Sequence, residues 1–84
     1  MHYVYVLQCT ADKEKFYLGC TSDLKQRLQS HNRGESRSTR GRHWRLIYYE
    51  AYTSLAAARK REYRLKQSGK AKASLLQRLR EDLE

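Results

Sequence analysis

The 84-residue sequence predicts one small α/β domain of the α+β kind, with a three-stranded antiparallel sheet flanked by helices. Two observations support this prediction. Three runs rich in aromatic and β-branched residues are typical of strands, and three other segments repeat apolar residues at helical spacing. A chain this short buries only about 60–65% of its unfolded surface, so we expect residues 1–84 to form a single domain.

The first two strands are predicted to form a hairpin. Residues 3–9 (YVYVLQC) and 15–20 (KFYLGC) have the composition of strands. The segment between them, residues 10–14, is polar and short enough to be a turn. The two strands should therefore pair with each other.

A helix and a loop are expected next. Apolar or half-apolar side chains recur at a spacing of about one helical turn at Leu24, Leu28 and His31. Thr21 or Ser22 is predicted to cap this helix, with Asp23 in its first turn and Gly34 at its end. Residues 34–43 are mostly Gly, Ser and Arg and are expected to form a flexible loop.

The last three elements are a strand and two helices. Residues 44–52 form a long aromatic and aliphatic run that predicts the third strand. Thr53 or Ser54 should cap a helix that runs to about Ser68. A final helix is expected from about Lys70, with one apolar face made by Leu75, Leu76, Leu79 and Leu83. The predicted order is β-β-α-β-α-α.

The positive charge is concentrated in two segments. The formal net charge is +9, from 18 Lys and Arg against 9 Asp and Glu. Most of the excess lies in residues 32–45 and 59–72, and such clustering favours a surface that binds nucleic acid over a merely solvated one. The side chains expected to hold a nucleic-acid backbone are Arg33, Arg37, Arg40, Arg42, Arg45, Arg59, Lys66 and Lys70.

Other features exclude several classes of protein. No apolar run approaches the roughly 18 residues of a membrane span, and no basic start precedes an apolar stretch as in a secretory signal. Two cysteines, Cys9 and Cys20, make no disulfide framework, and their spacing to His31 and His43 matches no zinc finger. We therefore expect a protein of the reducing cytoplasm, monomeric or weakly dimeric.

Two pairs of side chains are candidates for a site. Strand side chains alternate between faces, so Tyr5 and Tyr17 share a face only if their pairing sum is even, as when Tyr5 lies opposite Gly19. Arg27 and His31 are spaced i, i+4 and are therefore neighbours on the first helix.

A carboxylate on the second helix is the third candidate. Glu62 falls in the apolar stripe of that helix, with Leu55, Ala58 and Leu65. Burying a lone carboxylate is costly, so Glu62 needs a metal ion or an ordinary ion pair, for which the available cations are Arg27, Arg59 and Lys66.

Taken together, these segments resemble the GIY-YIG nuclease domain in its short stand-alone bacterial type. Residues 3–5 and 17–19 match the two name-giving motifs, and residues 23–32 match the first-helix motif. Residues 38–42 resemble the basic loop, residues 44–50 the third strand, and residues 57–66 the helix that bears the metal carboxylate. The sequence departs from the family at Tyr3, Val4 and Leu18, and lacks an asparagine after the second predicted helix.

The resemblance implies a metal-dependent DNA endonuclease with little sequence specificity, which leaves structure-selective cleavage open. Glu62 would bind one Mg²⁺ or Mn²⁺ and Arg27 the scissile phosphate, while His31 would hydrogen-bond a tyrosine or the phosphate. Tyr5 or Tyr17 would orient or deprotonate water, which requires nearby cations to lower a phenol pKa of about 10. Gly19 would be structural. The alternatives are a non-catalytic nucleic-acid-binding module and a protein-interaction domain for an acidic partner.

Overall fold

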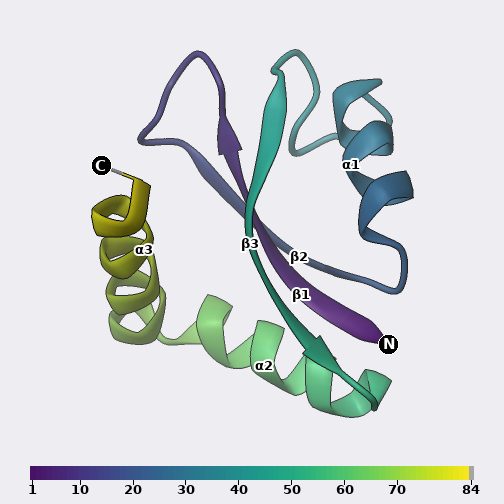
Figure 1. Cartoon of the computed structure of the whole chain (residues 1–84), viewed down its shortest axis with the longest axis vertical. Coiled ribbons are helices and arrows are strands. Elements are labelled where there is room, and N and C mark those ends of the chain that lie inside the picture. The colour runs from purple at the N-terminus through teal and green to yellow at the C-terminus, as the bar shows by residue number, and fades with distance from the viewer. Residues whose placement is uncertain (84) are drawn as a thin grey trace.

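A computed structural model describes residues 1–83 and shows a three-stranded sheet with helices on both faces (Figure 1). The strands lie in the order β2-β1-β3, and both pairs are antiparallel. The predicted order of elements and the antiparallel sheet are confirmed. The elements are β1 (His2–Cys9), β2 (Phe16–Thr21), α1 (Leu24–Asn32), β3 (Trp44–Tyr52), α2 (Leu55–Gln67) and α3 (Gly69–Leu83).

The central strand β1 divides the interior into two layers. Val4 and Val6 point to one face, where they pack against α2 and α3. Tyr5, Leu7 and Cys9 point to the opposite face, where they pack against α1. We call these the α2–α3 face and the α1 face; Figure 1 shows the helices on the two sides of the strands. Because both faces are covered, β1 is buried from its third residue to its end.

The start of α1 differs from the prediction. Asp23, rather than Thr21 or Ser22, is the N-cap, because its carboxylate accepts the backbone N–H of Gln26 at 3.0 Å. The Thr21 hydroxyl instead accepts the N–H of Asp23 at 3.1 Å, which shapes the turn that precedes the helix.

The two C-terminal helices begin at serine caps. Ser54 caps α2 through the N–H of Ala57, as one of the two predicted alternatives. Ser68 ends α2 and its hydroxyl accepts the N–H of Ala71, so α3 begins one residue before the predicted Lys70. Within residues 1–83, no helix combines the length and apolar character needed to cross a membrane.

The loop between α1 and β3 is anchored in the core at its middle. Thr39 is fully buried, and its carbonyl accepts the indole N–H of Trp44 at 3.0 Å. Gly34 and Gly41 on either side adopt positive φ angles of 77° and 84°, which favour glycine. Nothing in the composition of residues 34–43 indicated this anchor.

A half-buried carboxylate on β3 holds α2 against the sheet. Glu50 accepts the hydroxyls of Tyr48 and Tyr52, both at 2.6 Å. It also accepts two N–H groups of Arg61 at 2.9 and 3.0 Å, in a bidentate pair. Because Arg61 is thereby fixed, the rotation of α2 is fixed too, and the next residue, Glu62, is turned toward β2.

This network predicts a loss of stability in acid. Burial alone would raise the pKa of Glu50, but hydrogen bonds from Arg61, Tyr48 and Tyr52 lower it to about 2. In the unfolded chain the pKa of a glutamate is about 4.3. Because the pKa of Glu50 is lower in the folded protein, its ionised form stabilises the fold above about pH 4.3, and this stabilisation is lost as the pH falls toward 2.

Glu50→Gln should therefore lower the free energy of unfolding at neutral pH by about 1–3 kcal/mol, an amount reduced by the partial exposure of Arg61. Urea unfolding from pH 7 to pH 3 checks this. The difference in free energy of unfolding between the two proteins should become smaller below about pH 4.5. A difference that does not change with pH would contradict the lowered pKa of Glu50.

Candidate active site

Tyr5 and Tyr17 lie on the same face of the sheet. The register pairs Tyr5 with Gly19 and Leu7 with Tyr17, so the expected even pairing is confirmed. Both rings point to the α1 face, with centroids 6.3 Å apart. The His31 ring from α1 lies beside them, with its centroid 4.8 Å from that of Tyr17 and 6.0 Å from that of Tyr5.

A chain of hydrogen bonds runs through this cluster. The Tyr5 hydroxyl lies 2.8 Å from His31 Nε2, and Arg27 Nε donates to the same hydroxyl at 3.4 Å. His31 Nδ1 lies 2.7 Å from the Thr39 hydroxyl. Tyr5 is 2% exposed, and both His31 and Thr39 are 0% exposed. Thr39 belongs to the segment that resembles the family's basic loop, but no periodic spacing links it to His31, so sequence reasoning gave it no role.

Burial controls protonation in the cluster. Desolvation raises the pKa of Tyr5 to about 12, although the hydrogen bond from Arg27 opposes the rise. Desolvation also lowers the pKa of His31, and the charge of Arg27 lowers it further. Nearby cations were expected to lower a tyrosine pKa; at Tyr5, burial outweighs them. At neutral pH the site therefore holds a neutral phenol against a neutral imidazole.

Gly19 gives the Tyr5 ring its place. A Cβ atom on Gly19 would lie 2.6 Å from Tyr5 Cζ and still closer to the hydroxyl oxygen. The ring therefore crosses over β2 at Gly19 and carries the hydroxyl to the edge strand of the sheet.

Gly19→Ala should consequently displace a ring that is buried and has little room to move. We expect the free energy of unfolding to fall by about 1–3 kcal/mol, as for overpacking of a core, and any activity that depends on Tyr5 to fall with it. Urea denaturation measures the first effect. Gly69→Ala is the matched control, because a Cβ at Gly69 meets no atom within 4 Å; equal losses in both variants would contradict the steric explanation.

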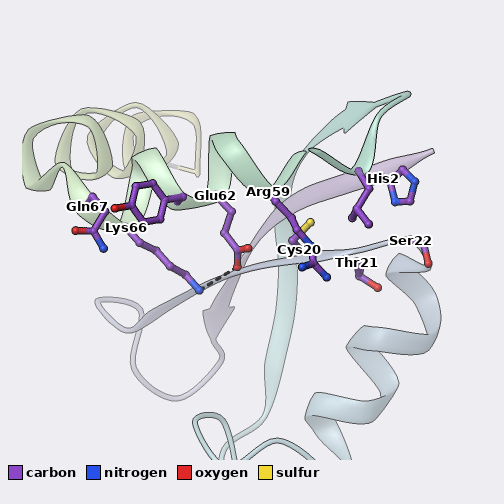
Figure 2. Close-up of a pocket in the computed structure, with 10 residues that line it drawn as sticks. His2, Cys20, Thr21, Ser22, Arg59, Glu62, Lys66 and Gln67 are labelled. Atoms are coloured by element: carbon purple, nitrogen blue, oxygen red, sulfur yellow. Dashed lines mark hydrogen bonds and ion pairs between the residues drawn. The ribbon is translucent and has the colours of Figure 1, made fainter. Parts of the chain in front are cut away.

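Glu62 faces a groove on the other side of β2. The groove has a volume of about 640 Å³ and lies between α2 and the end of β2. In Figure 2, Glu62 and Arg59 project from α2 toward β2, where Cys20 lies. The Glu62 side chain is 21% exposed, and its carboxylate accepts Lys66 Nζ at 2.9 Å. Of the cations considered as partners for Glu62, the structure pairs it with Lys66. The apolar stripe of α2 that contains Glu62 is only partly buried, because Leu55 at its start is exposed and lines the groove.

The two groups of side chains approach each other across the edge of the sheet. The Tyr5 ring crosses β2 at Gly19, and the groove is lined by the next two residues, Cys20 and Thr21. The negative charge of Glu62 contributes to the raised pKa of Tyr5, after the larger effect of burial. Within residues 1–83, Glu62 makes no hydrogen bond to the tyrosine cluster, and its carboxylate faces the groove.

The donor set fits a hard divalent cation bound mainly by water and substrate. Within residues 1–83, no three His, Cys, Asp or Glu side chains converge as a metal site. Mg²⁺ is commonly held by one or two carboxylates, with waters and phosphate oxygens completing its octahedron. Glu62 at the side of an open groove meets that requirement.

The basic residues that were expected to bind DNA are dispersed. Arg59 and Lys66 line the groove. Arg45 lies on the α2–α3 face, where it donates two hydrogen bonds to Gln8, away from the tyrosines. The others lie on the exposed surface of α1's C-terminus, the following loop and the start of α3: Arg33 (paired with Glu35), Arg37, Arg40, Arg42 and Lys70.

A comparison with protein families matches residues 1–78 to the GIY-YIG catalytic domain. The chain belongs to the GIY-YIG family. The resemblance in its motifs is thereby confirmed, and the tyrosine cluster lies where β1 and β2 carry the two name-giving motifs.

Relatives of similar length share this domain. A UPF0213 protein of Halobacterium salinarum is 38% identical over 78 residues, which cover 90% of this chain and 99% of that protein. A UPF0213 protein of Natronomonas pharaonis is 42% identical over 77 residues, covering 89% and 88%. The solution NMR structure of a UPF0213 protein from Bacillus halodurans is similar, with a TM-score of 0.54 and 35% identity over 90% of this chain and 82% of that one.

Proposed function

We propose that this protein is a divalent-metal-dependent DNA endonuclease that hydrolyses phosphodiester bonds with little sequence specificity. One observation supports it above the others. A buried tyrosine–histidine pair with an arginine and a groove carboxylate both adjoin the edge strand β2, the first at Gly19 and the second at Cys20 and Thr21. Phosphodiester hydrolysis needs an activated water, charge stabilisation on the phosphate and help for the leaving oxygen, which a proton acceptor, a cation and a metal ion can supply.

Glu62 would hold the metal, Mg²⁺ or Mn²⁺, which when bound polarises the phosphate and stabilises charge on the leaving oxygen. Lys66 would release Glu62 and turn to the DNA backbone. Arg27 donates a hydrogen bond from Nε to the Tyr5 hydroxyl. The two terminal nitrogens of its guanidinium group would bind the scissile phosphate.

Tyr5 is the better placed of the two tyrosines to accept a proton from water. A free phenolate is unfavourable there, because burial raises the pKa of Tyr5 to about 12. His31 Nε2, 2.8 Å away, can take the Tyr5 proton as Tyr5 takes one from water. The net transfer is from water to imidazole, and the phenol stays neutral.

Cleavage assays test this function. The purified protein should nick branched, nicked or linear DNA in the presence of Mg²⁺ or Mn²⁺ and leave all of them intact in EDTA. Intact substrates under every condition would contradict the proposal.

The ion pair between Glu62 and Lys66 favours one alternative, a non-catalytic nucleic-acid-binding module, because the pair already satisfies the carboxylate. Both functions require grip on a phosphate backbone. We expect affinity for DNA to fall steeply with salt, as counterions are released. Arg40→Ala or Arg42→Ala should weaken binding to all sequences alike and flatten that slope by about one unit.

Fluorescence anisotropy with labelled duplexes at several salt concentrations measures the slope. Salt-independent affinity would instead favour a protein-interaction domain.

A further inference from the structure

We propose that Thr39 is a positioning residue that holds His31 in the tautomer with its proton on Nδ1, so that Nε2 accepts the hydroxyl proton of Tyr5. The inference rests on the proposed function for its catalytic consequence only. The tautomer itself is a property of the folded protein and can be measured without any cleavage.

The hydrogen-bond partners determine the direction of each proton. Arg27 Nε can only donate, so the Tyr5 oxygen accepts there. The hydroxyl proton of Tyr5 is then free to point at His31 Nε2. A neutral imidazole with an acceptor at Nε2 carries its proton on Nδ1, which faces the Thr39 oxygen at 2.7 Å. Thr39 in turn can donate its own proton to the carbonyl of Ser36 at 3.5 Å.

The opposite tautomer leaves a buried donor without a partner. If Nε2 carried the proton, the Tyr5 oxygen would accept from both His31 and Arg27. The Tyr5 hydroxyl proton would then have no acceptor among residues 1–83 and would depend on water at a side chain that is 2% exposed. An unsatisfied buried donor is costly, so the tautomer with Nδ1 protonated is preferred.

Thr39 favours this choice because its hydroxyl proton can go to the Ser36 carbonyl, which leaves its oxygen to accept from Nδ1, and because its position does not depend on His31. Its backbone N–H donates to the Ser36 carbonyl at 3.2 Å, and its carbonyl accepts the Trp44 indole N–H at 3.0 Å. The groups that also face the His31 ring are Tyr5 from β1, Tyr17 from β2 and Arg27 from α1. None of these can bind Nδ1 in place of Thr39, because Nδ1 points away from the sheet into the loop.

Two substitutions separate the hydroxyl from the packing of the side chain. Thr39→Val keeps the shape and removes the oxygen, whereas Thr39→Ser keeps the oxygen and removes a methyl group. We expect Thr39→Val to slow cleavage by about 10- to 100-fold, the usual cost of losing a residue that orients another. Thr39→Ser should restore most of the rate.

The decisive experiment is a long-range ¹H–¹⁵N NMR correlation of the histidine rings at about pH 8, where an ordinary histidine is neutral. In the unmodified protein and in Thr39→Ser, His31 should show protonated Nδ1 and bare Nε2. In Thr39→Val, the population should shift toward protonated Nε2. His2 and His43, outside the network, serve as references in the same spectra.

Protonated Nε2 in the unmodified protein would overturn the proposal, as would an unchanged His31 spectrum in Thr39→Val. Neither result depends on cleavage, so a protein that shows the expected tautomers but cuts no DNA would refute the nuclease function and leave the role of Thr39 established.

Discussion

Glu62→Gln should abolish metal-dependent cleavage, with a loss of at least about 10²–10³-fold, the scale of removing one group that stabilises transition-state charge. The amide keeps the size of the side chain but is a much weaker ligand for a hard cation than a carboxylate. Stability should hardly change or should rise slightly, because within residues 1–83 the only ion pair lost is the i, i+4 pair with Lys66. Such exposed pairs contribute about 0.3–0.5 kcal/mol.

Initial rates of nicking and thermal unfolding curves check the two halves of this expectation. Glu81→Gln makes the same chemical change on the exposed surface of α3 and should leave the rate as it was. A large fall in melting temperature with cleavage retained would identify Glu62 as a structural ion-pair residue.

Tyr5→Phe is expected to have the second large effect. It removes one hydroxyl and keeps the ring that packs over Gly19, so the free energy of unfolding should fall by only about 0.5–1.5 kcal/mol. If that hydroxyl relays a proton from water to His31, the cleavage rate should fall by roughly 10²–10⁴-fold. Tyr17→Phe should cost less if Tyr17 only orients water.

Tyr48→Phe provides the matched control. Its hydroxyl is hydrogen-bonded to Glu50 on the α2–α3 face, away from the cluster. Tyr48→Phe leaves the bidentate Arg61 pair that fixes α2 in place, so it should lose stability but little activity. Full activity in both Tyr5→Phe and Tyr17→Phe would refute a site built on these hydroxyls.

The sequence was sufficient to predict the elements, because hydrophobic periodicity is a local property. It also stated the condition under which Tyr5 and Tyr17 share a face, because alternation along a strand leaves only the parity of the pairing open. The structure meets that condition by pairing Tyr5 with Gly19. The helix caps were less certain because neighbouring Thr, Ser and Asp side chains compete for the same backbone N–H groups. At α1 the competition favoured Asp23.

The contacts across the fold could not be predicted in this way. Thr39 reaches His31 only because the loop folds back over α1, and the loop sequence has no period that would indicate it. The fold, rather than any local pattern in the sequence, also determines that the arginines are dispersed over the surface. Arg45 follows Trp44 in sequence, but alternation along β3 turns it to the α2–α3 face, away from the tyrosine cluster.

The central claim is that Glu62 and the tyrosine cluster form one site across the edge of β2. Paramagnetic Mn²⁺ tests it directly, because a bound ion broadens the NMR signals of nearby nuclei. Titration with Mn²⁺ should broaden signals of Cys20, Tyr5 and Tyr17 before those of Lys13, which lies in the loop at the opposite end of the β1–β2 hairpin from Cys20. Glu62→Gln should remove this selective effect. Broadening that spares the tyrosines, or that persists in Glu62→Gln, would contradict a single metal-binding site at this edge.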